Sequence, residues 1–119
     1  MRHVMVVAVL LAGLAGCATS PPPPVPRTLD LPTPPALTLR EAAGLLMDRG
    51  YVIRHGDLEL GRLEAVLARS PGYRVRLEVM PDTGQTRLSA TASRGGRPLP
   101  PRILDPLLTD LQSRLGLLP

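Results

Sequence analysis

Proline is the residue that most limits what this chain can fold into, because eight of its 15 prolines fall between Ser20 and Ala36. Proline has no backbone N–H, so a segment this rich in proline cannot supply the hydrogen bonds of a helix or a sheet. We expect a tether over residues 17–36, in which Ser20–Ala36 is extended and polyproline-like, about 50 Å long at roughly 3.1 Å per residue. A spacer is its simplest role, and a docking site for a proline-recognising groove is the alternative. The folded domain is then confined to residues 37–119.

A basic N-terminus and an apolar run precede the tether. Arg2 is followed by the apolar stretch Val4–Leu14 and then by the small residues Ala15 and Gly16. The apolar run is shorter than the roughly 20 residues that a transmembrane helix needs. The order of basic, apolar and small residues is that of an export signal, so we expect residues 1–16 to be a signal peptide.

The segment Leu14-Ala15-Gly16-Cys17 resembles the lipobox of bacterial lipoproteins. The resemblance implies that Cys17 is acylated, that the leader is cut before it, and that Cys17 becomes the first residue of the mature protein. Two or three acyl chains are enough for stable membrane attachment. Ala18 in place of an aspartate favours the outer membrane, facing the periplasm, in the best-known Gram-negative sorting pattern. The alternative is an ordinary secretory leader that leaves Cys17 as a free thiol.

Composition points to an aliphatic core and a basic surface. Tyr51 and Tyr73 are the only aromatic residues, so leucine, valine, isoleucine and alanine must fill the core. With one cysteine, no intramolecular disulfide can form. Arginine alone supplies the positive charge behind the net value of +4. Without a basic cluster interleaved with aromatic residues, nucleic acid is a poor partner, whereas anionic lipid headgroups or envelope polysaccharide suit exposed arginines.

The first helix of the domain is expected over Leu39–Arg49, where apolar residues recur at helical spacing. Thr38 and Glu41 have the spacing of a capping box, in which each side chain satisfies a free backbone N–H of the first turn. Gly50 supplies the left-handed residue that ends many helices. The helix should therefore begin after Thr38 and end before Gly50.

Four strands are expected next, over residues 51–55, 62–68, 73–80 and 85–92. The third and fourth alternate apolar with polar residues, which predicts one buried and one wet face for a hairpin with its turn at Pro81–Gly84. Matching the apolar faces places Leu77 opposite Leu88. The same register places Glu78 opposite Arg87, as an exposed cross-strand ion pair.

Arg94–Pro101 is expected to be a loop, since it is rich in glycine and proline. Asp105 then caps a second helix with Pro106 at its first position, and the helix ends at Gly116. The predicted fold class is α+β: a two-layer sandwich of order α-β-β-β-β-α, with an antiparallel sheet and two helices on one face. This order is similar to the small helix-grip and related α+β domains of envelope lipoproteins, including components of outer-membrane assembly machines.

The domain has few residues in the pattern of a catalytic or metal site. His55 lies near Asp57 and Glu59, and these carboxylates with Glu64 include the residue types that glycoside hydrolysis uses, but nothing fixes their separation. Solvated charges at a turn and on a sheet face account for them as well. No spacing typical of zinc or calcium sites occurs, so we expect no metal and no cofactor.

These observations favour a membrane-anchored envelope lipoprotein that is a non-enzymatic structural or protein-interaction module. We expect it to contact an envelope protein through the open face of the sheet and the loop after it; the candidate residues are Arg62, Arg74, Arg76, Arg87, Arg94 and Arg97. The alternative is a binding module for anionic lipid or a cell-wall fragment, because guanidinium groups bind phosphate and carboxylate bidentately. An enzyme is the third class. Binding to lipid or glycan should weaken steeply with ionic strength.

Overall fold

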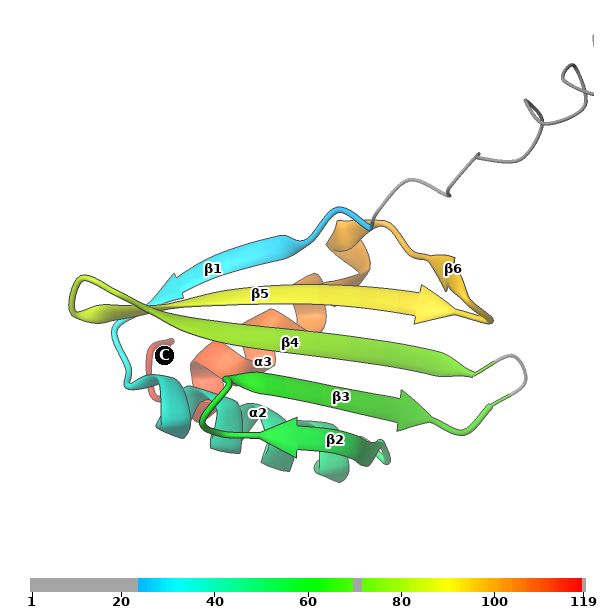
Figure 1. Ribbon diagram of the computed structural model, residues 1–119, viewed down its shortest axis with the longest axis horizontal. Helices are drawn as coiled ribbons and strands as arrows, with labels where there is room; N and C mark the ends of the chain where they lie inside the picture. The colour runs from blue at the N-terminus through cyan, green and yellow to red at the C-terminus, as the bar shows by residue number, and fades with distance from the viewer. Residues whose placement is uncertain (1–23, 70–71, 119) are drawn as a thin grey trace, which may run out of the picture.

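A computed structural model describes residues 24–69 and 72–118. Residues 1–16, the expected signal peptide, and the expected acylation site Cys17 lie outside the described residues. The protein is a mixed α+β fold in which an antiparallel sheet is combined with two helices (Figure 1). In chain order the elements are β1 (Arg27–Leu31), α2 (Pro35–Asp48), β2 (Val52–Asp57), β3 (Arg62–Leu67), β4 (Tyr73–Asp82), β5 (Gln85–Arg94), β6 (Arg97–Pro98), the 3-10 helix η1 (Pro101–Leu104) and α3 (Asp105–Arg114).

The sheet contains a strand that the sequence analysis assigned to the tether. Its strand order is β1-β5-β4-β3-β2, and β6 also pairs with β5. The predicted order α-β-β-β-β-α is therefore wrong, because β1 precedes the first helix and β6 precedes the second. An edge strand such as β1 needs hydrogen bonds on one side only, so prolines just outside it, at Pro26 and Pro32, do not prevent pairing. Residues 27–36, which the sequence analysis assigned to the tether, therefore belong to the folded domain.

The helix α2 begins without the expected capping box. Pro34 is the N-cap and Pro35 opens the first turn, where a missing N–H leaves nothing to cap. Thr38 is buried inside the helix, and its hydroxyl donates a hydrogen bond to the Pro34 carbonyl at 2.9 Å. The C-terminal prediction is confirmed, since Gly50 has φ +89° and its N–H bonds to the Met47 carbonyl at 2.9 Å.

The helix α3 also begins differently from the prediction. Leu104 is its N-cap and Asp105 is its first residue, with no side-chain cap. The helix ends just before Gly116, as expected; Gly116 has φ +75°, and the Leu117 N–H bonds to the Gln112 carbonyl at 2.9 Å. The glycine end of each helix was thus easier to predict than its start, because a left-handed C-terminal residue strongly favours glycine whereas an N-terminus tolerates several arrangements.

The β4–β5 hairpin is longer and tighter than predicted. Asp82 pairs with Gln85, so the turn has only two residues, Thr83 and Gly84, both with positive φ. Such two-residue turns fit the twist of a hairpin better than a four-residue one. The register consequently differs by two residues, and Leu77 lies opposite Ala90 rather than Leu88. A shift of two keeps every side chain on its predicted face.

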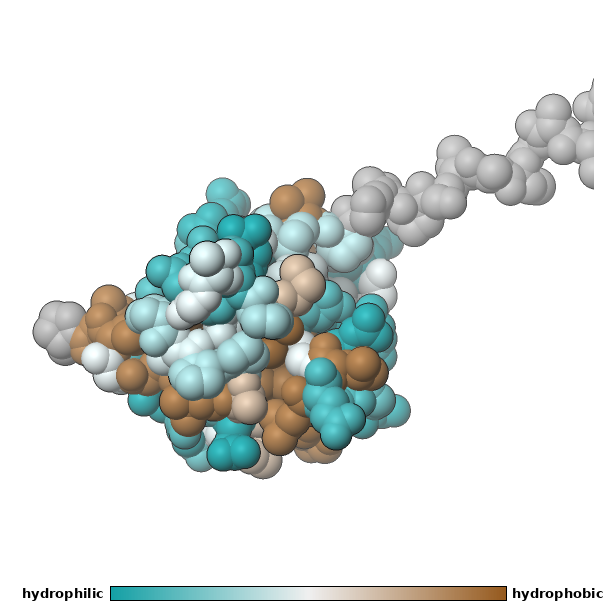
Figure 2. Space-filling model, turned by 60° about the vertical axis from the view of Figure 1, so that its left-hand side comes forward, coloured by the Kyte–Doolittle hydropathy of each residue, from teal (hydrophilic) through white to brown (hydrophobic). Residues whose placement is uncertain are grey.

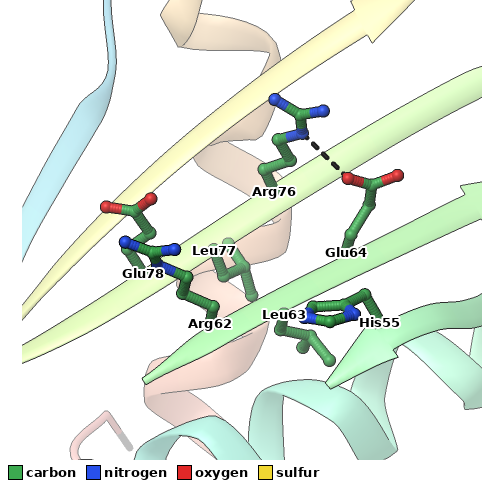
Figure 3. Close-up of a pocket in the computed structure, with 7 residues that line it drawn as sticks. All are labelled: His55, Arg62, Leu63, Glu64, Arg76, Leu77 and Glu78. Atoms are coloured by element: carbon green, nitrogen blue, oxygen red, sulfur yellow. Dashed lines mark hydrogen bonds and ion pairs between the residues drawn. The ribbon is translucent and has the colours of Figure 1, made fainter. Parts of the chain in front are cut away.

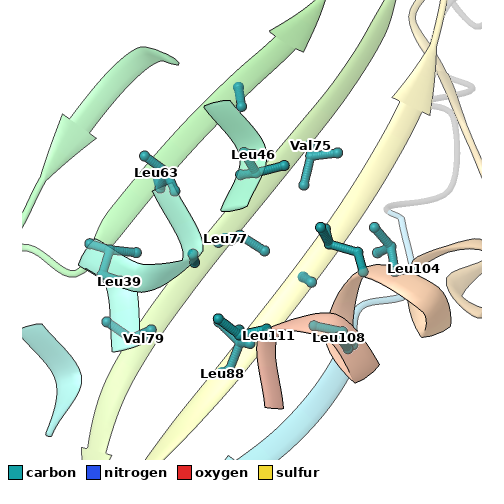
Figure 4. Packing of buried hydrophobic residues seen from close by; sticks show 14 of the residues in the cluster. Leu39, Leu46, Leu63, Val75, Leu77, Val79, Leu88, Leu104, Leu108 and Leu111 are labelled. Carbon is teal, nitrogen blue, oxygen red and sulfur yellow. The ribbon is translucent and has the colours of Figure 1, made fainter. Parts of the chain in front are cut away.

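The core lies between the sheet and the helices, which Figure 1 shows behind the sheet. Burial alternates along β4 and β5, so that every second side chain points toward the helices. The largest buried aliphatic side chains include Leu39 and Leu46 from α2, Leu77 from β4, Leu88 from β5 and Leu111 from α3 (Figure 4). These residues leave the other face of the sheet without cover from any described segment.

Candidate functional site

The uncovered face of the sheet, which we call the open face, carries four of the six candidate arginines. Arg62 lies on β3, Arg74 and Arg76 on β4, and Arg87 on β5, and all four are exposed. On each strand they alternate with buried residues, so the strand pleat alone directs them away from the helices. The buried residues are Leu63 on β3, Val75, Leu77 and Val79 on β4, and Leu88 on β5. The structure therefore brings these four residues onto one surface.

Glu64 is the central carboxylate of the open face. On β3 it lies directly opposite Arg76, and its Oε2 atom is 2.9 Å from the Arg76 Nε. Its Oε1 atom is 3.3 Å from the Nε of Arg74. Figure 3 shows the Glu64 and Arg76 side chains pointing toward each other. One carboxylate thus holds two of the candidate arginines in defined positions.

The remaining two arginines of the open face also lie beside acidic residues. Arg62 is opposite Glu78, and the two side chains lie next to each other in Figure 3. The Arg87 Nε atom is 3.1 Å from Oδ1 of Asp30 on β1, and its Nη2 atom is 3.1 Å from Oδ2 of Asp82. The hydrogen bond that Arg87 donates to Asp30 raises the pKa of its guanidinium. The predicted ion pair between Glu78 and Arg87 is wrong, because Arg87 lies opposite Met80 in the observed register.

Arg94 and Arg97 do not belong to the open face. Arg94 lies opposite Tyr73, and its guanidinium carbon is 5.0 Å from the centre of the tyrosine ring, which is a cation–π distance. Arg97 pairs with Arg94 across a two-residue turn formed by Gly95 and Gly96. The expected loop 94–101 therefore contains a β-hairpin, which places both arginines at one end of the sheet.

A shallow hollow of about 220 Å³ lies on the open face; its lining residues are His55, Arg62, Leu63, Glu64, Arg76, Leu77 and Glu78 (Figure 3). His55 is exposed and lies opposite Glu64. Glu64 is engaged by two arginines, so the hollow presents paired charges rather than a free acid and a free base. The hollow can bind a group whose own charges are arranged to complement these pairs.

Asp57, which was also considered for catalysis, has a structural role. The Asp57 Oδ1 atom accepts hydrogen bonds from the backbone N–H groups of Glu59 and Leu60, at 3.0 and 2.9 Å. This arrangement shapes the β2–β3 turn. Among residues 24–69 and 72–118, no group of three or more histidine, cysteine or carboxylate residues is arranged to hold a metal ion.

A second hollow, of about 240 Å³, lies between α2 and β2 and is lined mainly by apolar side chains; its residues are Leu39, Arg40, Ala43, Ile53, Gly56, Asp57, Leu58 and Leu63. It offers an apolar ligand a space between the sheet and α2. It lies beside β2, which has no strand neighbour on its outer side among the described residues.

Sequence reasoning placed Glu64 and Glu78 on the exposed face of the sheet but missed Asp30 and the observed ion pairs. Asp30 escaped notice because its segment was assigned to the tether, although Leu29 and Leu31 alternate with Thr28 and Asp30 in the period of a strand. Two apolar residues in so short a segment, flanked by prolines, were a weak signal. The pairing of Glu64 with two arginines depended on a register that the sequence did not supply.

No protein-family model matches this chain, and no curated protein matches it either. In the part of the chain that the structure describes, no helix combines the length and the apolar character that crossing a bilayer requires.

Proposed function

We propose that this chain is a lipid-anchored protein of the bacterial cell envelope, and that its domain is a non-enzymatic protein-interaction module. In this proposal Cys17 is acylated and holds the domain at the outer membrane, on the periplasmic side. Both helices cover one face of the sheet, and the open face meets the partner. The lipobox Leu14–Cys17 supports the anchor, and the uncovered, charge-paired surface supports the interaction.

The open face is the observation that carries the interaction role. Its arginines alternate with carboxylates across neighbouring strands, as in the row formed by Asp57, Arg62 and Glu78. Alternating charges of this kind select a partner with the complementary pattern and disfavour others. Arg87, which is paired with two aspartates, is already partly ordered, so less side-chain entropy is lost on binding.

The hydrophobic surface is consistent with a domain that stays outside the bilayer. Figure 2 views the side that carries the β4–β5 turn, where hydrophobic residues occur in separate groups among hydrophilic ones. Exposed large hydrophobic side chains such as Val52, Leu60 and Met80 come from β2, the β2–β3 turn and β4. A partner that binds the open face would therefore rely on polar contacts, with Met80 as an apolar neighbour.

The anchor is tested with the full precursor and its Cys17→Ser variant. We expect the wild-type product to carry acyl mass and to separate with membranes, and the variant to be unprocessed or soluble. A wild-type product that lacks acyl mass and is cut elsewhere would contradict the anchor.

The interaction is tested in the full chain with a photo-crosslinking residue at Ser89, in the centre of the open face, and at Thr109 on α3 as a control. We expect a discrete adduct from position 89 and none from position 109. The double change Arg62→Gln and Glu78→Gln keeps the net charge and should remove that adduct without lowering the melting temperature. An adduct from position 109 with none from position 89 would exclude the open face as the contact surface, and an adduct from position 89 that survives the double change would show that the partner does not recognise the Arg62 and Glu78 charges.

A further inference from the structure

The charges of the sheet are divided unequally between its two ends. We define the tether end as the part from the row of Glu64, Arg76 and Thr91 to the β5–β6 turn, and the turn end as the rest, up to the β4–β5 turn. The strands of the tether end carry five arginines and one carboxylate; these are Arg54, Arg74, Arg76, Arg94, Arg97 and Glu64. The strands of the turn end carry three arginines and four carboxylates; these are Arg27, Arg62, Arg87, Asp30, Asp57, Glu78 and Asp82.

The basic end is also the end at which the N-terminal segment enters the domain. Pro24, the first described residue, lines a hollow of about 210 Å³ together with Arg74, Arg76, Thr91 and Ser93. Two guanidinium groups and two hydroxyl groups therefore surround a recess at this end. Guanidinium groups bind phosphate oxygens bidentately, and hydroxyl groups add further donors.

The distance to the proposed acylation site is short. Pro24 lies seven positions after Cys17 in the sequence, so the two residues are at most about 25 Å apart whatever the conformation between them. An acylated Cys17 lies at the membrane surface, so the recess beside Pro24 is within reach of the lipid headgroups. The turn end lies at the other end of the sheet, where carboxylates outnumber arginines.

We infer that the tether end docks onto an anionic lipid surface, with the recess of Arg74, Arg76, Thr91 and Ser93 receiving a headgroup phosphate. The inference rests on the proposed lipid anchor at Cys17, which brings the domain to the membrane. Docking through the tether end orients the domain so that the turn end of the open face points away from the bilayer, toward a partner. Basic residues near an anionic surface each strengthen binding by about fivefold.

The docking is tested with residues 17–119 carrying Cys17→Ser, which contain every described helix and strand and cannot be acylated. Co-sedimentation is measured with phosphatidylcholine vesicles that contain or lack phosphatidylglycerol, at low and high salt. We expect binding only to the anionic vesicles and a steep loss at high salt. Because no acyl chain is involved, this result is independent of the mass measurement that tests the anchor.

Matched variants locate the surface. Arg74→Gln with Arg97→Gln should weaken vesicle binding about 25-fold, from about fivefold for each arginine. Arg40→Gln with Arg87→Gln removes the same charge from α2 and the turn end and should leave binding close to wild type. Glu64→Gln removes the only carboxylate in the strands of the tether end and should strengthen binding about fivefold.

Three outcomes would overturn the docking inference. The first is equal binding to vesicles with and without phosphatidylglycerol. The second is an equal loss of binding in the two double variants, which would mean that only net charge matters. The third is binding to isolated peptidoglycan or polysaccharide without binding to anionic vesicles, which would assign the tether end to the cell wall.

Discussion

Arg114 of α3 lies directly over Gly44 of α2. A methyl group added at Gly44 would come within 2.6 Å of the Arg114 Nη2 atom. The same guanidinium reaches Glu41 at 2.8 Å and Asp48 at 2.6 Å. Since Glu41, Gly44 and Asp48 are spaced by three and four residues, they share one face of α2. The missing side chain at Gly44 is what lets one arginine bridge two carboxylates and join the two helices.

This relationship predicts a coupling between positions 44 and 114. Alanine favours a helix over glycine by about 1 kcal/mol, so Gly44→Ala should raise the free energy of unfolding by about that amount when Arg114 is already alanine. With Arg114 present, the new methyl group displaces its guanidinium, and the gain should be smaller. Urea unfolding of the four proteins of this double-mutant cycle measures the difference. The same gain in both backgrounds would show that the two residues do not interact.

A second prediction concerns Gly61 in the β2–β3 turn. Gly61 has φ +67°, and a methyl group added there would lie 2.3 Å from the Val79 carbonyl oxygen. Gly61→Ala should therefore lower the free energy of unfolding by about 3 kcal/mol, through left-handed strain and displacement of β4. Gly84→Ala is the control, because its φ is +77° with no atom within 4 Å of the added group. It should lose only about 1 kcal/mol, and equal losses would disprove the steric argument.

A third prediction tests whether β1 is part of the domain. Leu31 is 1% exposed within the core, so Leu31→Ala should lower the free energy of unfolding by about 2–5 kcal/mol, through lost burial and a cavity. Val25, which is 68% exposed, provides the control, and Val25→Ala should change stability by less than about 0.5 kcal/mol. If Leu31→Ala is as mild as the control, the tether prediction through residue 36 would be restored.

A fourth prediction concerns the buried hydroxyl of Thr86. Thr86 is fully buried and donates a hydrogen bond to the Thr33 carbonyl, which ties β5 to the segment before α2. Thr86→Val keeps the shape but removes the donor, so the partly buried Thr33 carbonyl loses this hydrogen bond at a cost of about 1 kcal/mol. Thr91→Val on the open face is an isosteric control in the same strand. Thermal unfolding should show a clearly lower melting temperature for Thr86→Val alone.

Local pattern was sufficient for most of the sheet but not for how its strands are paired. The alternation of Leu77 and Val79 with Glu78 and Met80 predicted the buried face of β4 correctly. The partner of Glu78 was wrong because the turn needs two residues rather than four. Alternation has period two, so registers that differ by two residues satisfy it equally well. Only the backbone geometry of the turn separates them.

For the candidate site, too, local pattern predicted which face each residue lies on but not which residues pair. Alternation placed Arg62, Arg74, Arg76 and Arg87 together on the open face, as expected. The pairing of Arg87 with Asp30 joins two strands that are 57 residues apart in the sequence, so no local pattern could predict it. Arg94 was assigned to a loop, and the structure instead places it against Tyr73 at the end of the sheet.

The sequence by itself determined the α+β class, both glycine helix ends and the faces of the long strands, because those features depend on contacts between residues near in the chain. The tertiary structure decided that Arg27–Leu31 is a strand, that Glu64 holds two arginines, and that the basic residues gather where Pro24 enters. These features depend on hydrogen bonds and charges contributed by distant segments. A short, proline-flanked segment becomes a strand only when a partner strand supplies its hydrogen bonds.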